Sequence, residues 1–316
     1  MRVIICGLGN QGKKRSRVAG DDVCAMIDPI AVEADYNKFS AISDLSFEAG
    51  LICTPEYEKL SLIKSLLDSG KHVMVEKPLY SSNHTELLEL FKYARANNKA
   101  LYVAYNHRFE PHIQTAKDLL ERGSFGAIYS VKMFYGNGTA QDVRSSPWRD
   151  SGLGVLGDLG CHLLDLTLFL LGPKTKSATF MPWIVKSNEN KAPDYCLFGT
   201  QGSSNCPRIV LEASLLSWRN MFSIEIVCEK GSLLIDSLCK WGRSTLTVRM
   251  RKYPSGRPDE KITTIVADDV TWEHEYSFFK DLCSDLGGYD WERDIWINTV
   301  MQKLAPELFC QIGGEI

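Results

Sequence analysis

The chain has 316 residues, of which 44% are hydrophobic and 24% charged, and its formal net charge is −3. This length suits two globular domains, and the composition allows a well-packed core. The near-balanced charge gives no reason to expect a nucleic-acid or anionic-membrane partner. The longest candidate for a membrane-spanning segment, residues 163–171, is interrupted by Asp165 and is only about half a membrane span. We therefore expect a soluble, cytoplasmic protein.

Two further features of the composition point to surface and core rather than to a site. The ten cysteines include no C-x-x-C pair, and several lie in apolar runs, so we expect reduced structural thiols. The short basic cluster Lys13-Lys14-Arg15 is typical of a solvated face.

The first hundred residues alternate short apolar runs with amphipathic stretches. The runs are nearly continuous in apolar character, as in parallel strands that are buried on both faces. The predicted strands are Val3–Cys6, Val23–Ile27, Leu51–Cys53, Val73–Val75 and Leu101–Ala104, and the predicted helices are Glu58–Ser69 and Thr85–Asn97. This alternation with short connections predicts right-handed crossovers and an open, doubly wound parallel sheet, which is an α/β Rossmann fold.

The pattern changes after a predicted helix at about residues 111–122, because strands then follow one another without helices between them. These strands are Ile128–Tyr135, Ile209–Leu216, Phe222–Val227, Leu233–Ile235, Leu246–Arg251 and Ile262–Val266. They indicate a mostly antiparallel open sheet, accompanied by helices near residues 157–171, 275–286 and 295–308. We therefore expect a Rossmann domain over residues 1–121 and an α+β domain over residues 122–316.

A glycine-rich segment, Gly7-Leu8-Gly9-Asn10-Gln11-Gly12, follows the first predicted strand and opens a helix. In a G-x-G-x-x-G turn the first glycine permits the tight turn, the second lets the backbone approach a pyrophosphate, and the third lets the helix pack on the sheet. The helix N-terminus presents free N–H groups to the phosphates. The alternative is a glycine turn in a sheet that binds no dinucleotide.

Asp28 ends the second predicted strand, where a carboxylate accepts hydrogen bonds from the hydroxyls of an adenosine ribose. Its charge would repel a 2′-phosphate. The segment therefore predicts a site that favours NAD and leaves NADP possible.

Three further segments place polar side chains where chemistry is expected. Glu76-Lys77-Pro78 ends a predicted strand, at the edge where such sheets bind ligands. Asn106 follows the next strand. Asp158 and His162 lie four residues apart, on one face of a predicted helix.

Each of these segments also has a plainer interpretation. A lysine before a proline is usually a surface cation, and an Asp/His pair is more often a local hydrogen bond. The pair Asp158 and His162 could also bind a metal, but the sequence offers no third ligand near it, so we expect no metal site.

Together with the glycine turn, these segments resemble the glucose–fructose oxidoreductase/inositol dehydrogenase (Gfo/Idh/MocA) family. The resemblance rests on the order and spacing of motifs over about residues 1–172. The motifs are Gly7 to Gly12, Thr54-Pro55, Gly70-Lys71-His72-Val73 through Glu76-Lys77-Pro78, Tyr105 to Phe109, Trp148-Arg149 and Gly154 through Asp165. One departure is that a histidine common after the T-P step is absent, and Glu56-Tyr57-Glu58 occupies that stretch.

The resemblance implies an NAD(P)-dependent oxidoreductase that transfers a hydride between nicotinamide and a secondary alcohol or ketone of a sugar, cyclitol or nucleotide sugar. It implies catalytic roles for Lys77, Asp158 and His162. An ammonium at Lys77 would stabilise a developing alkoxide, His162 would take the proton, and Asp158 would orient the imidazole or bind the substrate. The implied cofactor contacts are Gly7, Gly9, Asn10, Gln11, Gly12, Asp28, Thr54, Pro55, Glu76 and Lys77, and the implied substrate contacts are Asn106, Trp148 and Arg149.

The resemblance also implies a homodimer or homotetramer that forms through the exposed sheet face of the second domain. Arg108, Arg144 and Arg149 are candidates for contacts with a nucleotide sugar. Two other classes of function stay open. One is a non-catalytic, dinucleotide-binding regulatory protein of the same fold, and the other is a metal-dependent hydrolase or lyase that uses Asp158 and His162.

Overall fold

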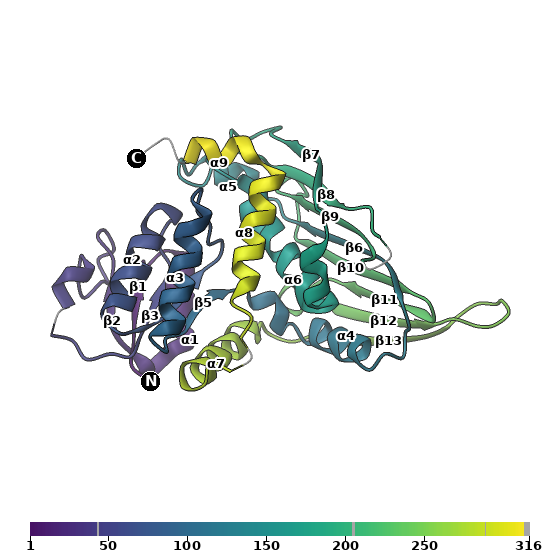
Figure 1. The fold of residues 1–316 in the computed structure, drawn as a ribbon, viewed down its shortest axis with the longest axis horizontal. Coiled ribbons are helices and arrows are strands. Elements are labelled where there is room, and N and C mark those ends of the chain that lie inside the picture. Colours follow the sequence, from purple (N-terminus) through teal and green to yellow (C-terminus); the bar gives the residue numbers. More distant parts are fainter. Residues whose placement is uncertain (43, 204–205, 288, 313–316) are drawn as a thin grey trace. The chain divides into compact units, whose positions relative to one another are not determined.

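The computed structural model describes residues 1–42, 44–203, 206–287 and 289–312, and the chain divides into two compact units. The first unit comprises Met1–Asn106 and Trp272–Asn298, and the second comprises His107–Thr271 and Thr299–Ile316. Figure 1 shows the course of the chain. None of the helices in the described ranges is long and apolar enough to cross a membrane.

A five-stranded, all-parallel sheet forms the centre of the first unit, with the strand order β2-β1-β3-β4-β5. Its strands are β1 (Val3–Cys6), β2 (Val23–Ile27), β3 (Ala49–Ile52), β4 (His72–Glu76) and β5 (Leu101–Ala104). Every residue of β1, β3 and β5 is buried, which is why these strands have no polar alternation in the sequence. The predicted Rossmann sheet is confirmed.

Helices cover both faces of this sheet. They are α1 (Asn10–Ala19), α2 (Glu56–Asp68), α3 (His84–Ala96) and α7 (Thr271–Ser284). α1 packs on β1 and β3, while α2 packs on β3 and β4. Tyr276 and Phe279 of α7 join the core that Ile5, Leu51 and Tyr102 build on one face of the sheet.

The strand order reverses direction between β1 and β3, since β2 lies on one side of β1 while β3, β4 and β5 follow on the other. Ligands of doubly wound sheets bind outside the carboxyl ends of the strands at such a point. The register pairs Cys6 with Ile52 and Ile52 with Val75, so β1, β3 and β4 end at one edge. The glycine turn, Thr54 and Lys77 all follow directly after that edge.

The second unit contains an eight-stranded sheet with the order β13-β12-β11-β10-β6-β9-β8-β7. Its strands are β6 (Ile128–Gly136), β7 (Met181–Lys186), β8 (Tyr195–Thr200), β9 (Arg208–Ser214), β10 (Met221–Cys228), β11 (Gly231–Asp236), β12 (Ser244–Met250) and β13 (Asp259–Ile265). Only the β6–β9 pair is parallel among the described strands of this sheet. The mostly antiparallel sheet is therefore confirmed.

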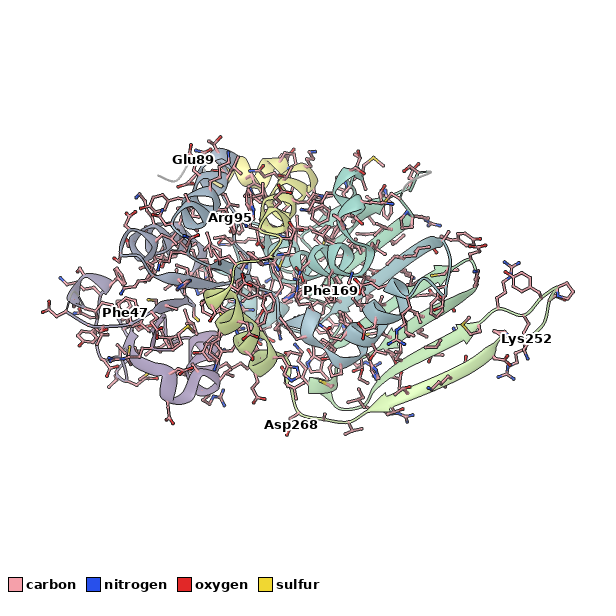
Figure 2. All side chains as sticks on the ribbon, turned by 60° about the horizontal axis from the view of Figure 1, so that its bottom comes forward. Phe47, Glu89, Arg95, Phe169, Lys252 and Asp268 are labelled. Carbon is pink, nitrogen blue, oxygen red and sulfur yellow. The ribbon has the colours of Figure 1, made fainter. Side chains whose placement is uncertain are left out.

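Two helices, α4 (Pro111–Glu121) and α6 (Cys161–Leu171), lie side by side against one face of this sheet (Figure 1). The hairpin of β12 and β13 carries the exposed Lys252 near its tip (Figure 2). Strand β7 has no counterpart among the predicted strands, because most of its residues are exposed and it therefore shows no alternation of apolar and polar residues. β8 was missed as well.

The remaining helices begin and end at residues that differ from the predicted ones. The helix predicted at residues 157–171 begins as a π-helical turn, Leu156–Gly160, and continues as α6. Pro306 divides the predicted last helix into α8 (Glu292–Leu304) and α9 (Pro306–Ile312). The other short helices are α5 (Ala140–Arg144) and the 3-10 turns Gly20–Asp22, Phe39–Ile42, Asn106–Phe109, Pro173–Ser177 and Cys239–Trp241.

The units divide the chain at a different place from the boundary we expected after residue 121. Helix α4 packs on α6, β11 and β12, so it belongs to the second unit. The segment Trp272–Asn298 returns to the first unit because α7 completes its core. A single domain boundary in the sequence cannot describe a chain that leaves the first unit and later returns to it.

Candidate functional site

The glycine turn has the geometry that its sequence predicts. Gly7 has φ +92°, in the left-handed region that favours glycine. A Cβ on Gly12 would lie 1.8 Å from the carbonyl oxygen of Gly7, so this position accepts no side chain. By contrast, a Cβ on Gly9 would meet no atom within 4 Å. Gly7 and Gly12 are thus required by the fold, whereas Gly9 leaves space beside the backbone.

The surroundings of this turn fit the pyrophosphate of a dinucleotide. The described part of the chain provides no side-chain cap for the N-terminus of α1, where Asn10 and Gln11 lie, so the first-turn N–H groups are available to an anion. Thr54 follows β3, and a Cβ on Gly7 would lie 3.0 Å from its backbone nitrogen. The Thr54 hydroxyl is buried and has no hydrogen-bond partner among the described residues, which is rare unless a ligand or water supplies one.

Asp28 is held in place by backbone N–H groups at the end of β2. One carboxylate oxygen accepts from Leu8 at 2.7 Å, and the other accepts from Ile30 and Ala31 at 2.9 Å. Burial alone would raise the pKa of Asp28, but these donors and the charge of Lys13 hold it below the usual value. Asp28 therefore carries its negative charge at neutral pH, with room for about one more donor.

A pocket of about 380 Å³ opens beside Asp28. Its lining consists of Asp28, Pro29, Ala31, Ala34, Asp35, Tyr36, Asn37 and Ala41. A space of this size at the end of β2 suits the adenosine half of a dinucleotide.

Glu76, the last residue of β4, points into a buried ion cluster. Its carboxylate accepts from Nε of Arg15 at 2.7 Å, and Nη2 of Arg15 donates to Glu275 of α7 at 2.5 Å. Arg15 is only 2% exposed, so assigning it to a solvated face was wrong. Lys13 does lie at the surface, paired with Glu33. A cofactor contact from Glu76 stays a prediction, because its side chain already binds Arg15.

A second buried cation lies beside the same strand end, and the sequence analysis did not identify it. Lys59 of α2 donates to the backbone carbonyls of Glu76 and Pro78, on either side of Lys77. Its position four residues after Pro55 is the only signal in the sequence, and helical periodicity does not distinguish a buried lysine from a surface one.

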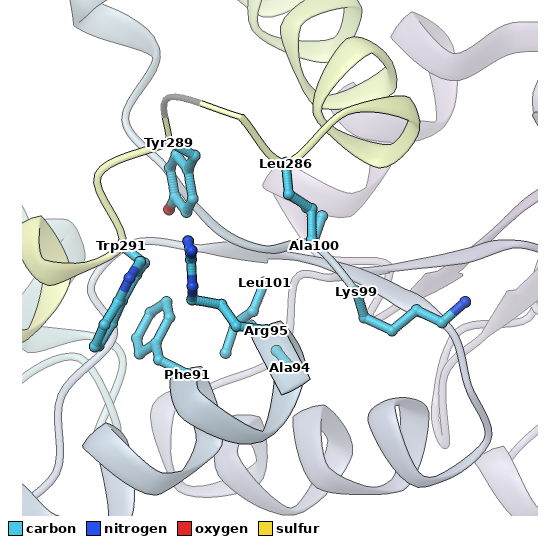
Figure 3. Close-up of a pocket in the computed structure, with 9 residues that line it drawn as sticks. All are labelled: Phe91, Ala94, Arg95, Lys99, Ala100, Leu101, Leu286, Tyr289 and Trp291. Atoms are coloured by element: carbon cyan, nitrogen blue, oxygen red, sulfur yellow. The ribbon is translucent and has the colours of Figure 1, made fainter. Parts of the chain in front are cut away.

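The first unit has another small pocket, shown in Figure 3, which is not a candidate site. Phe91 and Trp291 stack at 6.2 Å between ring centroids, and Arg95 lies 5.9 Å from the Trp291 ring. The pocket's volume is about 10 Å³, room for about one water molecule.

In the second unit, Asp158 lies in the π-helical turn and His162 in the first turn of α6. Single π turns inside helices occur frequently at functional sites. His162 is 4% exposed, whereas Asp158 is partly exposed and lies 4.0 Å from Nη2 of Arg149. Trp148, beside Arg149, is about half exposed. Asn106, by contrast, is buried at the end of the first unit.

The ring of His162 packs in a cluster that the sequence analysis missed. His107 stacks on it with 4.1 Å between ring centroids, and Tyr135 lies 5.9 Å from it. Nζ of Lys240 lies 3.1 Å from Nε2 of His107. An ammonium can only donate, so the charged form of Lys240 pairs with the tautomer of His107 whose Nε2 carries no proton. The cluster combines residues from four separate stretches of the chain, so no local sequence pattern predicts it.

Two motif residues bind each other. Arg108 donates to Asp165 of α6 through Nε at 3.2 Å and Nη2 at 2.5 Å, and Asp165 is fully buried. Arg144 pairs with Glu189 at 2.7 Å. Arg108 and Arg144 are thus engaged within the protein.

No group of three or more possible metal ligands occurs among the described residues. The nine cysteines that the structure describes are free thiols. Burial raises the pKa of Cys6 to about 12, which makes this thiol inert at neutral pH.

Comparisons with known proteins agree with this geometry. Residues 1–105 match the model of an oxidoreductase family with an NAD-binding Rossmann fold, and residues 113–234 match the GFO/IDH/MocA C-terminal domain. An uncharacterized oxidoreductase of Schizosaccharomyces pombe is 31% identical over 141 residues, 43% of this chain and 37% of that protein. Inositol 2-dehydrogenase of Rhodococcus jostii is 24% identical, over 74% of this chain and 68% of that protein.

Among solved structures, levoglucosan dehydrogenase in complex with NADH superimposes with a TM-score of 0.82 at 18% identity, and the match covers 98% of this chain and 97% of that one. At this identity the likeness shows the fold alone.

Proposed function

Because the chain belongs to the Gfo/Idh/MocA family of NAD-binding oxidoreductases, we propose that it transfers a hydride between nicotinamide and a secondary alcohol or ketone of a sugar or cyclitol. The observation that carries the proposal is the shared edge of β1, β3 and β4. The glycine turn, the Thr54 hydroxyl and Lys77 all follow this edge, so the dinucleotide cradle and a lysine lie at the same end of one sheet.

Bound NAD supplies the hydride acceptor, and the chain supplies binding, orientation and proton transfer. The α1 N-terminus and Gly9 would hold the pyrophosphate, and Asp28 would hold the adenosine ribose. The Asp28 charge disfavours a 2′-phosphate and so favours NAD over NADP.

We assign the proton chemistry to Lys77, Asp158 and His162. The ammonium of Lys77 binds the reacting hydroxyl and stabilises the negative charge that develops on its oxygen. The imidazole of His162 takes the proton that the hydroxyl loses, and Asp158 orients the imidazole or binds the substrate. We further assign substrate contacts to Asn106, Trp148 and Arg149, because each of the other hydroxyls needs a partner once it is buried.

The arginines favour a free sugar or cyclitol over a nucleotide sugar. A diphosphate needs cationic groups that can turn toward it. Arg108 is held by the buried Asp165, and Arg144 pairs with Glu189, which leaves Arg149 as the candidate with the weakest internal pairing.

The test is a screen of free sugars, cyclitols and nucleotide sugars with the purified protein and either NAD or NADP, read by the absorbance of NADH or NADPH. We expect turnover on a free polyol with NAD. NAD binding without turnover on any alcohol or ketone in the panel would favour the regulatory alternative. Activity that is indifferent to NAD and abolished by a chelator would favour the hydrolase or lyase alternative.

We also propose that the second unit forms a homo-oligomer through its sheet. Large apolar side chains are exposed on its strands, among them Tyr129, Trp183, Ile184 and Ile262, and such side chains often mark an interface when they are contiguous. Light scattering gives the mass in solution, and a monomer over the concentration range of the assays would contradict this proposal.

A further inference from the structure

Lys59 is a buried ammonium with a complete set of acceptors. The residue is 2% exposed. Nζ donates to the carbonyl oxygen of Glu76 at 2.8 Å and to that of Pro78 at 2.7 Å, and it lies 3.5 Å from a carboxylate oxygen of Glu56. An ammonium has three donors, and each of them has a partner here.

Burying a lysine costs more free energy than burying an apolar residue, so packing alone does not explain a lysine at this position. Removing an ammonium from water is unfavourable unless hydrogen bonds and opposite charges replace the water. Burial lowers the pKa of Lys59, Glu56 and Glu76 oppose this effect, and the like charge of Lys77 adds to it. An apolar side chain would pack at this position of α2 without that cost. The reason for an ammonium here must therefore lie in the groups that it binds.

Its two backbone acceptors are the carbonyls on either side of Lys77. Fixing both neighbours of a residue leaves few torsions free, chiefly those of its own side chain. The strand end is anchored a second time, because the Glu76 side chain binds the buried Arg15, which in turn binds Glu275. Lys77 thus follows a strand whose end is fixed through both backbone and side chain.

We propose that Lys59 is a positioning residue, whose ammonium holds the backbone on both sides of Lys77 and so fixes where the Lys77 amine meets the reacting hydroxyl. The inference rests on the proposed catalytic role of Lys77. Misplacing a reacting group by about 1 Å costs on the order of 100-fold in rate. A backbone that is held less firmly at Lys77 should therefore lower kcat.

Two substitutions separate the hydrogen bonds of Lys59 from its charge. Lys59→Met removes both with a side chain of similar length, while Lys59→Gln keeps an amide donor and removes the charge. Lys64→Met is the matched control on the same helix, because Lys64 is exposed, pairs with Asp68 and lies over the Tyr93 ring, away from the backbone at Lys77. Rates are expressed per NAD-binding site, measured by titration, so that loss of folded protein does not count as loss of catalysis.

We expect Lys59→Met to lower kcat per site about tenfold or more, while the Kd of NAD changes less than about twofold and KM changes little. Lys59→Gln should restore part of the rate, and Lys64→Met should match the wild type. A Lys59→Met enzyme whose melting temperature falls while kcat per site is unchanged has lost only stability, and the proposal is then wrong.

A second readout needs no turnover. Acetic anhydride acetylates only unprotonated amines, and peptide mass spectrometry reports the extent at Lys77 as a function of pH. Removing the neighbouring positive charge in Lys59→Gln should move the midpoint for Lys77 to higher pH, since like charges disfavour protonation. The alkaline limb of the pH–rate profile should move the same way.

Together with kcat, this readout distinguishes the two proposals. A shifted midpoint in a protein without dehydrogenase activity overturns the proposed function and leaves the coupling of the two lysines standing. In an active enzyme, a wild-type kcat per site in Lys59→Met overturns the inference about Lys59 and leaves the proposed function standing.

Discussion

The two units hold their candidate groups in different ways. In the first unit the proposed cofactor cradle is built from backbone: a left-handed glycine, a helix N-terminus and an open Gly9. In the second unit the candidate group is a side chain, His162, enclosed by His107 and Tyr135. Backbone N–H groups bind any ligand that carries a phosphate. A packed cluster of side chains instead determines which reaction can take place. Changes in the first unit should therefore act on NAD affinity and changes in the second on turnover, with Lys77 and Lys59 as the exceptions in the first unit.

The largest effect should come from His162→Ala and Lys77→Ala. Each removes a group that acts on the proton or charge of the reacting hydroxyl, so we expect kcat to fall by about 100-fold or more. The Kd of NAD, measured by calorimetry, should stay within a few-fold of the wild type. His112→Ala is the control in the second unit, since His112 is also buried but contacts the Ser244 carbonyl instead of the cluster. Wild-type turnover in either catalytic variant would remove our assignment of the residue that it replaces.

The glycine turn offers a matched pair that tests the cradle itself. Gly9→Ala adds a methyl group in open space, so the fold should be kept while the Kd of NAD rises about tenfold or more, about 1.4 kcal/mol. Gly12→Ala places its methyl group against the Gly7 carbonyl and should lower the melting temperature instead. Unchanged NAD affinity in Gly9→Ala would mean that no pyrophosphate approaches this backbone.

The smallest effect should come from Asp28→Asn, which removes one charge and keeps the side-chain shape. We expect the ratio of NADP to NAD affinity to rise several-fold, about 1 kcal/mol or less, because the repulsion of a 2′-phosphate is gone. Fluorescence titration with both cofactors measures this ratio. Equal losses for NAD and NADP would show that Asp28 acts through its bonds to Leu8, Ile30 and Ala31 rather than through its charge.

The contrast between the units also explains what could be predicted from the sequence. Continuous apolar runs and glycine spacing are local signals, and they led to the Rossmann sheet, the turn and the position of Lys77. Long-range pairings leave no such signal. Arg15 looked like part of a basic surface run, yet its partners Glu76 and Glu275 lie 61 and 260 residues away. The pairing of Arg108 with Asp165 and the stacking of His107 on His162 were missed for the same reason.

The central claim is direct hydride transfer to nicotinamide, and isotope transfer tests it most directly. The alcohol found in the screen is prepared with deuterium on its carbinol carbon and incubated with NAD and the wild-type protein. Mass spectrometry then gives the mass of the cofactor that is formed. Our account predicts one deuterium in each molecule of NADH formed. NADH without deuterium, or product formed with no reduction of NAD, would contradict it.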